Sequence, residues 1–163
     1  MKTILLTQNK FAFVDDEDFE RLNQYKWYTK REGNTWYATR GSKKLDDKGK
    51  QKLIRMHREI LNAPKGIPVD HINGNGLDNR KKNIRVATKT QNAQNQKHPR
   101  RDNKLGIKGV CWDGKLKKFK AGIKFNGKSI HLGYFNVLGD ADSAYRIAEE
   151  KYFKEFARKA GQD

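Results

Sequence analysis

Apolar and polar residues alternate from Phe119 to Phe125, which is the pattern of a β-strand with one buried face. Asn126-Gly127 follows directly, and this dipeptide is typical of a two-residue hairpin turn. Ile130–Tyr134 provides a returning strand, and residues 108–113 form a further short strand candidate. The pattern therefore predicts a three-stranded antiparallel sheet.

A helical pattern follows this sheet, from Asp140 to Lys159. Its apolar residues recur at helical spacing and form one stripe: Ala141, Ala144, Tyr145, Ala148, Tyr152 and Phe156. We expect this helix to cover the sheet face that holds Phe119, Ala121, Ile123 and Phe125. Together these elements predict a small α+β domain over residues 106–158.

Residues 1–51 are expected to form a β-rich N-terminal segment. Phe11–Val14 is a strand candidate, and the acidic run Asp15–Asp18 is suited to open a short helix. Two pairs of aromatic residues flank Gly33-Asn34, which predicts a hairpin. Residues 43–52 have no periodicity and are expected to form a polar loop, and residues 56–61 a short helix or strand.

The stretch from Val69 to Gln96 predicts a strand, a turn, a second strand and a helix. Its strands are the apolar runs at 67–69 and 84–86, and the turn begins in the cluster at 73–76. Thr88 and Gln91 have the spacing of a capping box at the start of the helix. This order would bring four polar side chains within reach of one another: Asp70, His71, Asn83 and Asn92.

Composition favours small units and a polyanionic partner. Of the 163 residues only 35% are hydrophobic, which argues against one large core, and the formal net charge of +17 indicates nucleic acid. A membrane-surface protein should show a basic amphipathic helix or a lipidation motif, and neither is present. Cys111 is the single cysteine, which excludes an internal disulfide and a Cys-rich zinc site. The apolar run at residues 4–6 is too short for a signal peptide, so we expect a cytoplasmic protein.

Much of the positive charge lies in the second half of the chain. Residues 101–128 hold nine Lys and Arg against two acids, and residues 98–105 are expected to form a basic linker. A lysine-rich sheet face is typical of a surface that binds DNA phosphates, although an ordinary solvated face is the alternative. The candidate DNA-binding residues are Arg100, Arg101, Lys104, Lys108, Lys115, Lys117, Lys118, Lys120 and Lys124.

Hydrolysis of a phosphodiester needs a base to activate water and a cation to stabilise the charge that develops on phosphate. His71 is suited to the first role because an imidazole titrates near neutral pH. Asp70 would face the other side of an ideal strand, so that a distorted strand end is needed for both to share a site. Asn92 can offer an oxygen to Mg²⁺, and Asn83 can hydrogen-bond the imidazole. His57 has three interpretations: a phosphate contact, an accessory group of the active site, or a structural histidine.

Residues 52–97 resemble the HNH endonuclease family, in the His-Asn-Asn form found in phage and intron-encoded homing endonucleases. The matching pieces are Asp70-His71, the Asn-Gly-Asn turn, Asp78-Asn79-Arg80, Asn83-Ile84-Arg85 and the start of the last helix. The resemblance implies a ββα-metal fold with His71 as general base and Asn83 as the residue that orients it. It also implies one divalent metal ion, Mg²⁺ or Mn²⁺, on Asp70 and Asn92, without a small-molecule cofactor. Asn92 replaces the third histidine of other HNH enzymes.

Residues 106–157 resemble the AP2 DNA-binding domain, in Gly109-Val110, the 118–123 strand, the 131–135 run and Ala144-Tyr145. The resemblance implies that the three-stranded sheet binds the major groove of double-stranded DNA. Cys111 and Asp113 stand where plant members carry DNA-contacting arginines, so phosphate contacts by lysines are the expectation here.

These observations predict a metal-dependent DNA endonuclease of the homing type. Two alternatives are a DNA-binding regulator that keeps only the HNH fold, and a basic ribosome-associated protein. Nicking by a monomer and double-strand cleavage by a dimer are both compatible with the sequence.

Overall fold

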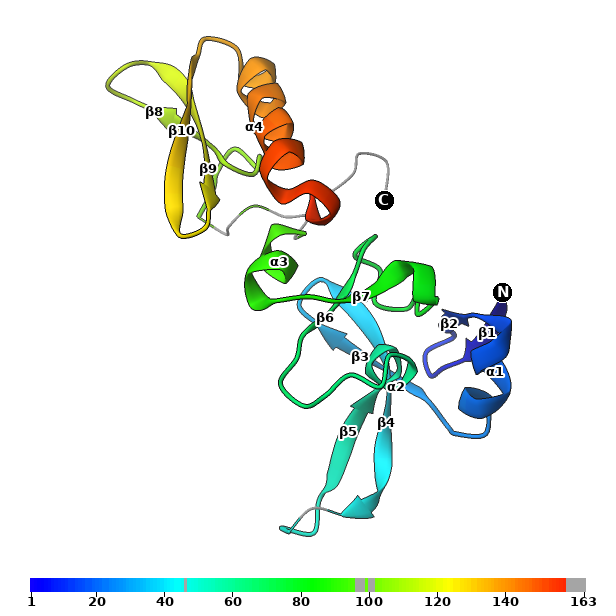
Figure 1. Ribbon diagram of the computed structural model, residues 1–163. Coiled ribbons are helices and arrows are strands. Elements are labelled where there is room, and N and C mark those ends of the chain that lie inside the picture. The colour runs from blue at the N-terminus through cyan, green and yellow to red at the C-terminus, as the bar shows by residue number, and fades with distance from the viewer. Residues whose placement is uncertain (46, 96–98, 100–101, 158–163) are drawn as a thin grey trace. The chain divides into compact units, whose positions relative to one another are not determined.

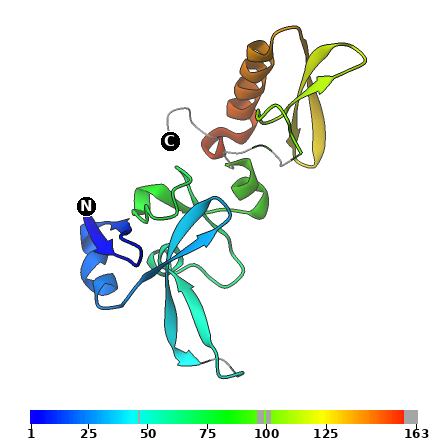
Figure 2. The same ribbon diagram turned by 180° about the vertical axis from the view of Figure 1, so that it is seen from behind.

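The computed structural model describes residues 1–45, 47–95, 99 and 102–157 (Figure 1). The chain forms two compact units, and the boundary between them falls after Asn92. Both combine short helices with small antiparallel sheets, as the same ribbon shows from behind (Figure 2), which confirms the expected α+β class. In the described part of the chain no helix is long and apolar enough to span a membrane.

Three small sheets and four short helical segments build the first unit. Its strands are β1 (Lys2–Leu5), β2 (Phe11–Val14), β3 (Tyr28–Glu32), β4 (Thr35–Leu45), β5 (Gln51–Arg55), β6 (Val69–His71) and β7 (Ile84–Val86). Its helical segments are α1 (Asp16–Asn23), α2 (Met56–Ile60), the 3-10 turn η1 (Lys81–Asn83) and α3 (Lys89–Gln94), whose last two residues pass into the second unit. The strands pair antiparallel in the orders β1-β2, β3-β4-β5 and β6-β7.

The sequence predicted most of these elements. The strand at 11–14, the helix opened by the acidic run and the hairpin around Gly33-Asn34 are confirmed. The polar loop expected over residues 43–52 is wrong at both ends, because β4 continues to Leu45, which pairs with Gln51 at the start of β5. The strand expected at 67–69 lies two residues later along the chain.

A single apolar core holds the first unit together. Its buried residues come from both the N-terminal segment and the predicted nuclease segment: Ile4, Leu6, Ala12, Val14, Leu22, Trp27, Ala38, Met56, Ile60 and Ile84. Burial of such side chains contributes about 1.5–3 kcal/mol each. The two segments therefore fold around shared apolar contacts.

The N-terminal segment also holds the loop that follows β6. Phe13 donates its N–H to Leu77 O (2.9 Å), and Asn79 donates its N–H to Phe13 O (2.8 Å). Gly76 N lies 3.1 Å from Thr35 Oγ1, and a Cβ at Gly76 would overlap the carbonyl oxygen of Trp36. A glycine is therefore required where this loop approaches β4.

The second unit is a three-stranded antiparallel sheet covered by one helix, as the sequence predicted, but the helix runs from Leu138 to Phe153 where Asp140 to Lys159 was expected. Its elements are β8 (Val110–Asp113), β9 (Lys118–Phe125), β10 (Lys128–Phe135), α4 (Leu138–Phe153) and the 3-10 turn η2 (Lys154–Phe156). The strand order is β10-β9-β8, and α4 packs mainly on β9. The β9–β10 hairpin turns at Asn126-Gly127, where both residues have a positive φ.

Gly109 precedes β8 with a φ of +73°, and a Cβ there would overlap the ring of Tyr145 on α4. Gly109→Ala should lower the free energy of unfolding of the second unit by about 2 kcal/mol, since both backbone strain and a clash are introduced. Urea unfolding followed by Trp112 fluorescence measures the loss. Gly114→Ala is the matched control, because no atom lies within 4 Å of a Cβ there, and it should shift stability by no more than about 0.5 kcal/mol. Equal stability of the two variants would contradict this packing.

Candidate active site

The loop between β6 and β7, residues 72–83, is held by its own polar side chains. Asn83 Oδ1 accepts a hydrogen bond from Asn73 N (3.0 Å), and Asn83 Nδ2 donates to Asp78 O (2.8 Å). The buried Asp78 carboxylate accepts from Asn73 Nδ2 (3.0 Å) and from Arg80 Nε (2.7 Å). Burial acts to raise the pKa of Asp78, but the charge and hydrogen bonds of Arg80 together with the hydrogen bond from Asn73 outweigh it, so the pKa is lowered. Asn83 therefore stabilises the conformation of the loop that follows His71.

His71 ends β6 and is buried. Its Nε2 lies 3.3 Å from Asn79 Oδ1, and Asn79 Nδ2 donates to Leu77 O (3.1 Å). Because the Asn79 amide group points its oxygen at the ring, Nε2 is the nitrogen that carries the proton. In the neutral ring the basic lone pair is then on Nδ1.

Burial lowers the pKa of His71, while the hydrogen bond to Asn79 and the charges of Asp70 and Asp78 act to raise it. The imidazole is therefore neutral at physiological pH, which is the protonation state that a general base requires. Because the charge of Asp70 acts on this pKa, the two neighbouring side chains interact electrostatically. The sequence alone did not decide whether they share a site.

Asp70 forms an ion pair across the sheet with Arg85, its partner in the β6–β7 register. Its Oδ2 lies 3.1 Å from Arg85 Nε and 3.0 Å from Nη2, and both side chains are largely buried. The Arg85 guanidinium therefore holds the Asp70 carboxyl group in place across the sheet.

The helix α3 begins directly after the β6–β7 sheet. Ala87 donates its N–H to Pro68 O (3.1 Å), one residue beyond the ladder. Thr88 N donates to Gln91 Oε1 (2.7 Å), and Gln91 N donates to Thr88 Oγ1 (3.1 Å). These reciprocal bonds confirm the predicted capping box. They start the helix at the position that places Asn92, which is exposed, on its first turn.

The donors offered by Asp70 and Asn92 suit a hard divalent cation. Mg²⁺ prefers oxygen ligands, commonly one or two carboxylates with water and substrate phosphate in the other positions. Among the described residues, three carboxylates also converge at Asp15, Glu17 and Asp18, outside the segment that holds His71. There Lys81 Nζ lies 2.6 Å from Glu17 Oε1.

His57, on α2, packs against the candidate base. Its ring lies edge-on to that of His71 at 4.8 Å between centroids, and Tyr37 on β4 lies 5.5 Å from His57 and 5.8 Å from His71. His57 is buried, and among the described residues its Nδ1 has no hydrogen-bond partner. Burial lowers the pKa of His57 to about 2, and Arg55, Arg58 and His71 when it is protonated act in the same direction. His57 is therefore a neutral ring in contact with His71.

A family model described as HNH endonuclease matches residues 62–94, the segment that holds Asp70, His71, Asn83 and Asn92. An uncharacterized HNH endonuclease of Acanthamoeba polyphaga mimivirus is 30% identical over 150 residues, which cover 90% of this chain and 73% of the relative. This chain belongs to the HNH endonuclease family. Protein 3.8 of Escherichia phage T7 is 30% identical over 112 residues, covering 66% of this chain and 91% of the phage protein. No solved structure matches the chain.

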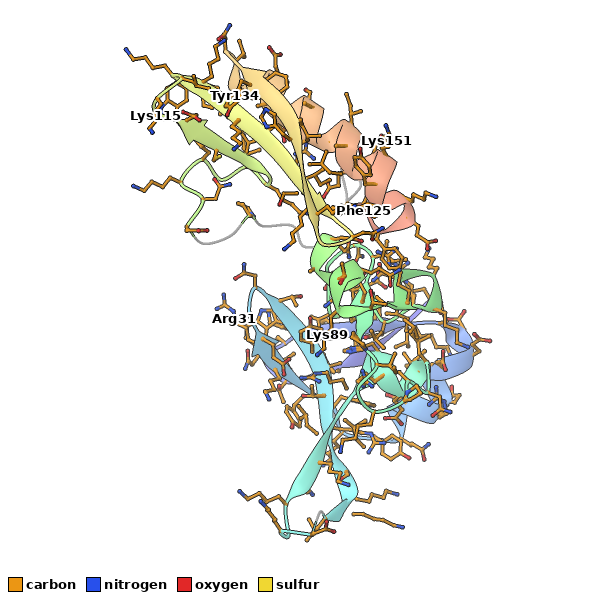
Figure 3. The ribbon with its side chains drawn as sticks, turned by 60° about the vertical axis from the view of Figure 1, so that its left-hand side comes forward. Arg31, Lys89, Lys115, Phe125, Tyr134 and Lys151 are labelled. Carbon is orange, nitrogen blue, oxygen red and sulfur yellow. The ribbon has the colours of Figure 1, made fainter. Side chains whose placement is uncertain are left out.

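The candidate DNA-binding residues of this HNH endonuclease differ from one another in their exposure to solvent. Six of them are exposed: Lys104, Lys115, Lys117, Lys118, Lys120 and Lys124. Figure 3 shows Lys115 at the turn between β8 and β9. Arg100 and Arg101 lie outside the described residues.

Lys108 requires a correction. Its Nζ lies 2.6 Å from both Glu149 Oε1 and Gln94 O, so that it neutralises a buried carboxylate of α4 instead of facing solvent. The sequence could not indicate this, because Glu149 lies 41 residues further along the chain. We therefore remove Lys108 from the DNA-binding set.

Asn79 and Tyr37 are the residues that the sequence did not single out for the site. Asn79 lies in the Asp78-Asn79-Arg80 segment that resembles the HNH family. Its contact with His71, however, depends on the path of the loop formed by residues 72–83. Tyr37 belongs to one of the two aromatic pairs that predicted the hairpin, and nothing in the sequence connected it with His71. Asn79 could have been noticed as a polar residue of the motif without an assigned role.

Proposed function

We propose that this protein is a metal-dependent DNA endonuclease of the homing type, acting on double-stranded DNA inside the cell. In this proposal residues 52–97 form the ββα-metal nuclease unit, and residues 106–158 form an AP2-like unit that binds DNA. The observation that carries it is the buried, neutral His71 held by Asn79 beside the Asp70 carboxylate.

His71 is the proposed general base. With Nε2 donating to Asn79 Oδ1, Nδ1 accepts the proton of the attacking water, and the positive charge that develops faces the carboxylates of Asp70 and Asp78. A divalent ion, when bound by Asp70 and Asn92, would stabilise negative charge on the phosphate and on the leaving oxygen. Arg85 holds the Asp70 carboxylate in place across the sheet.

We assign the positioning of the imidazole to Asn79, with Asn83 acting through the loop. Both amide atoms of Asn83 are engaged with the loop backbone, at Asn73 N and Asp78 O. Asn79 is buried and is hydrogen-bonded to the ring. His57 and Tyr37 contribute ring contacts that limit rotation of His71.

The outer face of the second unit supports the proposed DNA-binding role. Lys118, Lys120 and Lys124 are exposed there, while Ala121 and Ile123 are buried on the face toward α4. Asp113 Oδ1 accepts hydrogen bonds from Lys115 N and Leu116 N, both at 3.0 Å. Asp113 therefore stabilises the β8–β9 turn and leaves the lysines to contact phosphate, which predicts salt-sensitive binding.

The test is cleavage of supercoiled plasmid DNA by the full chain with Mg²⁺ or Mn²⁺, with and without excess EDTA. We expect nicked or linear product only when the metal is available. Mapping the cut on each strand of a target library then decides between nicking and double-strand cleavage. Tight binding to DNA without metal-dependent cutting would overturn the proposal in favour of a DNA-binding regulator.

A further inference from the structure

The strand β4 extends well beyond its pairing with β3. Its first part, from Thr35 to Thr39, pairs with β3, whereas from Arg40 to Leu45 its partner among the described strands is β5. We call residues 41–53 the ribbon. Figures 1 and 2 both show the ribbon projecting away from the rest of the first unit. Two-stranded ribbons gain little stability on their own, so an extension of this length needs another reason.

The ribbon exposes positive charge on lysine side chains. Its sequence holds five lysines against two aspartates. Among the described residues, no ion pair joins Lys43, Lys44 or Lys52 to a carboxylate, and all three side chains are exposed. The arginines at its base are paired instead, Arg40 with Glu59 and Arg55 with Glu32. Lys43, Lys44 and Lys52 therefore place positive charge beyond these paired arginines.

The ribbon also exposes apolar side chains on one face. Leu45 pairs with Gln51, and Gly41 pairs with Leu53, so the register places both leucines on the same side. Leu45 is 59% exposed and Leu53 is 38% exposed. Lysines together with exposed leucines on a narrow two-stranded element match a DNA groove, which presents phosphates at its edges and, within, base edges that include the thymine methyl groups.

A bulge shapes the ribbon between Gly41 and Leu45. There Ser42 Oγ accepts from Lys52 N (2.9 Å) and donates to Lys44 O, which ties Ser42 and Lys44 of β4 to Lys52 of β5. Bulges increase the local twist of a strand pair and redirect its side chains. Two-stranded ribbons that bind DNA must follow the curvature of the groove, and a twisted ribbon is suited to that.

The ribbon is a direct continuation of elements that carry the candidate active site. Tyr37 on β4 contacts His71, and β5 leads without a break into α2, which carries His57. At about 3.3 Å per residue, Leu45 lies at most roughly 26 Å along the strand from Tyr37. That length corresponds to about eight base pairs of DNA at 3.4 Å each.

We propose that the ribbon is a DNA-contacting arm that enters a groove of the substrate within about eight base pairs of the cleaved phosphate. Leu45 and Leu53 face the bases, and Lys44 and Lys52, which lie on the opposite face of the ribbon, reach the phosphates along the two edges of the groove. This inference rests on the proposed endonuclease function, and it assigns to the N-terminal segment a role in selecting the position of the cut.

The experiment compares Lys44→Ala/Lys52→Ala with the wild type and with Lys26→Ala/Lys65→Ala, in the full chain. The control pair removes the same charge from exposed sites of the same unit, outside the ribbon. DNA affinity is measured as a function of salt concentration. If both ribbon lysines contact phosphate, the slope of log K against log salt should weaken by about 1.8, against no change for the control pair.

A second readout locates the contact on DNA. Hydroxyl-radical footprints of the wild type and of Leu45→Ser/Leu53→Ser should differ within about eight base pairs of the cut, and the half-maximal DNA concentration for cleavage should rise. Circular dichroism checks that the exposed substitutions leave the fold intact. If the wild type cuts DNA while the ribbon variants match it in salt slope and footprint, the proposed DNA-contacting role of the ribbon is wrong. The proposed endonuclease function is then unaffected. A wild type that neither binds nor cuts DNA overturns both.

Discussion

His71→Ala is expected to lower the rate of metal-dependent DNA cleavage by about 10²–10⁴-fold, the range that a positioned general base contributes. The effect should appear in the single-turnover rate at saturating DNA, because His71 is buried at the end of β6 and contributes no phosphate charge. The affinity for DNA in the absence of metal should change little. A lowered cleavage rate with an unchanged affinity for DNA would show that His71 acts in catalysis and not in binding.

Two further measurements distinguish a loss of catalysis from a loss of folding. His71→Gln keeps a polar side chain that can still bond to Asn79, and it should show the same loss of rate with a native unfolding midpoint. Added imidazole should restore part of the rate of His71→Ala, since the small base can occupy the space left by the ring. Wild-type cleavage by His71→Ala would remove the catalytic assignment.

Local patterns in the sequence predicted the parts of the fold that depend on neighbouring residues. The Asn126-Gly127 hairpin and the Thr88–Gln91 capping box are set by residues a few positions apart, and both are confirmed. The ends of the ribbon were missed for a physical reason. Neither face of the ribbon is fully buried, so its strands lack the apolar alternation from which a strand is recognised.

The sequence predicted which residues belong to the candidate site better than it predicted the contacts between them. Asp70, His71, Asn83 and Asn92 were identified from motif spacing, but the partner of the imidazole, Asn79, depends on how residues 72–83 return to β7. The same limit explains Lys108, whose charge was visible but whose pairing with Glu149 joins distant parts of the chain. Contacts between residues far apart in sequence follow from packing, which the pattern of one chain does not specify.

The pH dependence of stability should reveal His57 as a buried neutral histidine. In the folded state burial lowers its pKa to about 2, whereas an unfolded histidine titrates near 6.5. Below pH 6.5 the unfolded chain therefore binds a proton that the folded chain does not, so stability is lost as pH falls. The slope approaches 1.4 kcal/mol per pH unit, which amounts to about 2 kcal/mol between pH 6.5 and 5. His71, whose pKa is also lowered, adds to this loss in the same direction.

Urea unfolding at pH 7.5, 6.5, 5.5 and 4.5 tests this, in a Trp112→Phe background so that Trp27 and Trp36 report only on the first unit. His57→Phe should reduce the slope below pH 6.5 by close to one proton, because it removes one site that takes up a proton on unfolding. Tyr37→Phe is the matched control, since it alters the same ring cluster without removing a group that titrates in this range, and it should keep the wild-type slope. An unchanged slope in His57→Phe would mean that His57 is protonated in the folded protein. Its ring would then repel a protonated His71 and could not serve as the neutral support proposed for the base.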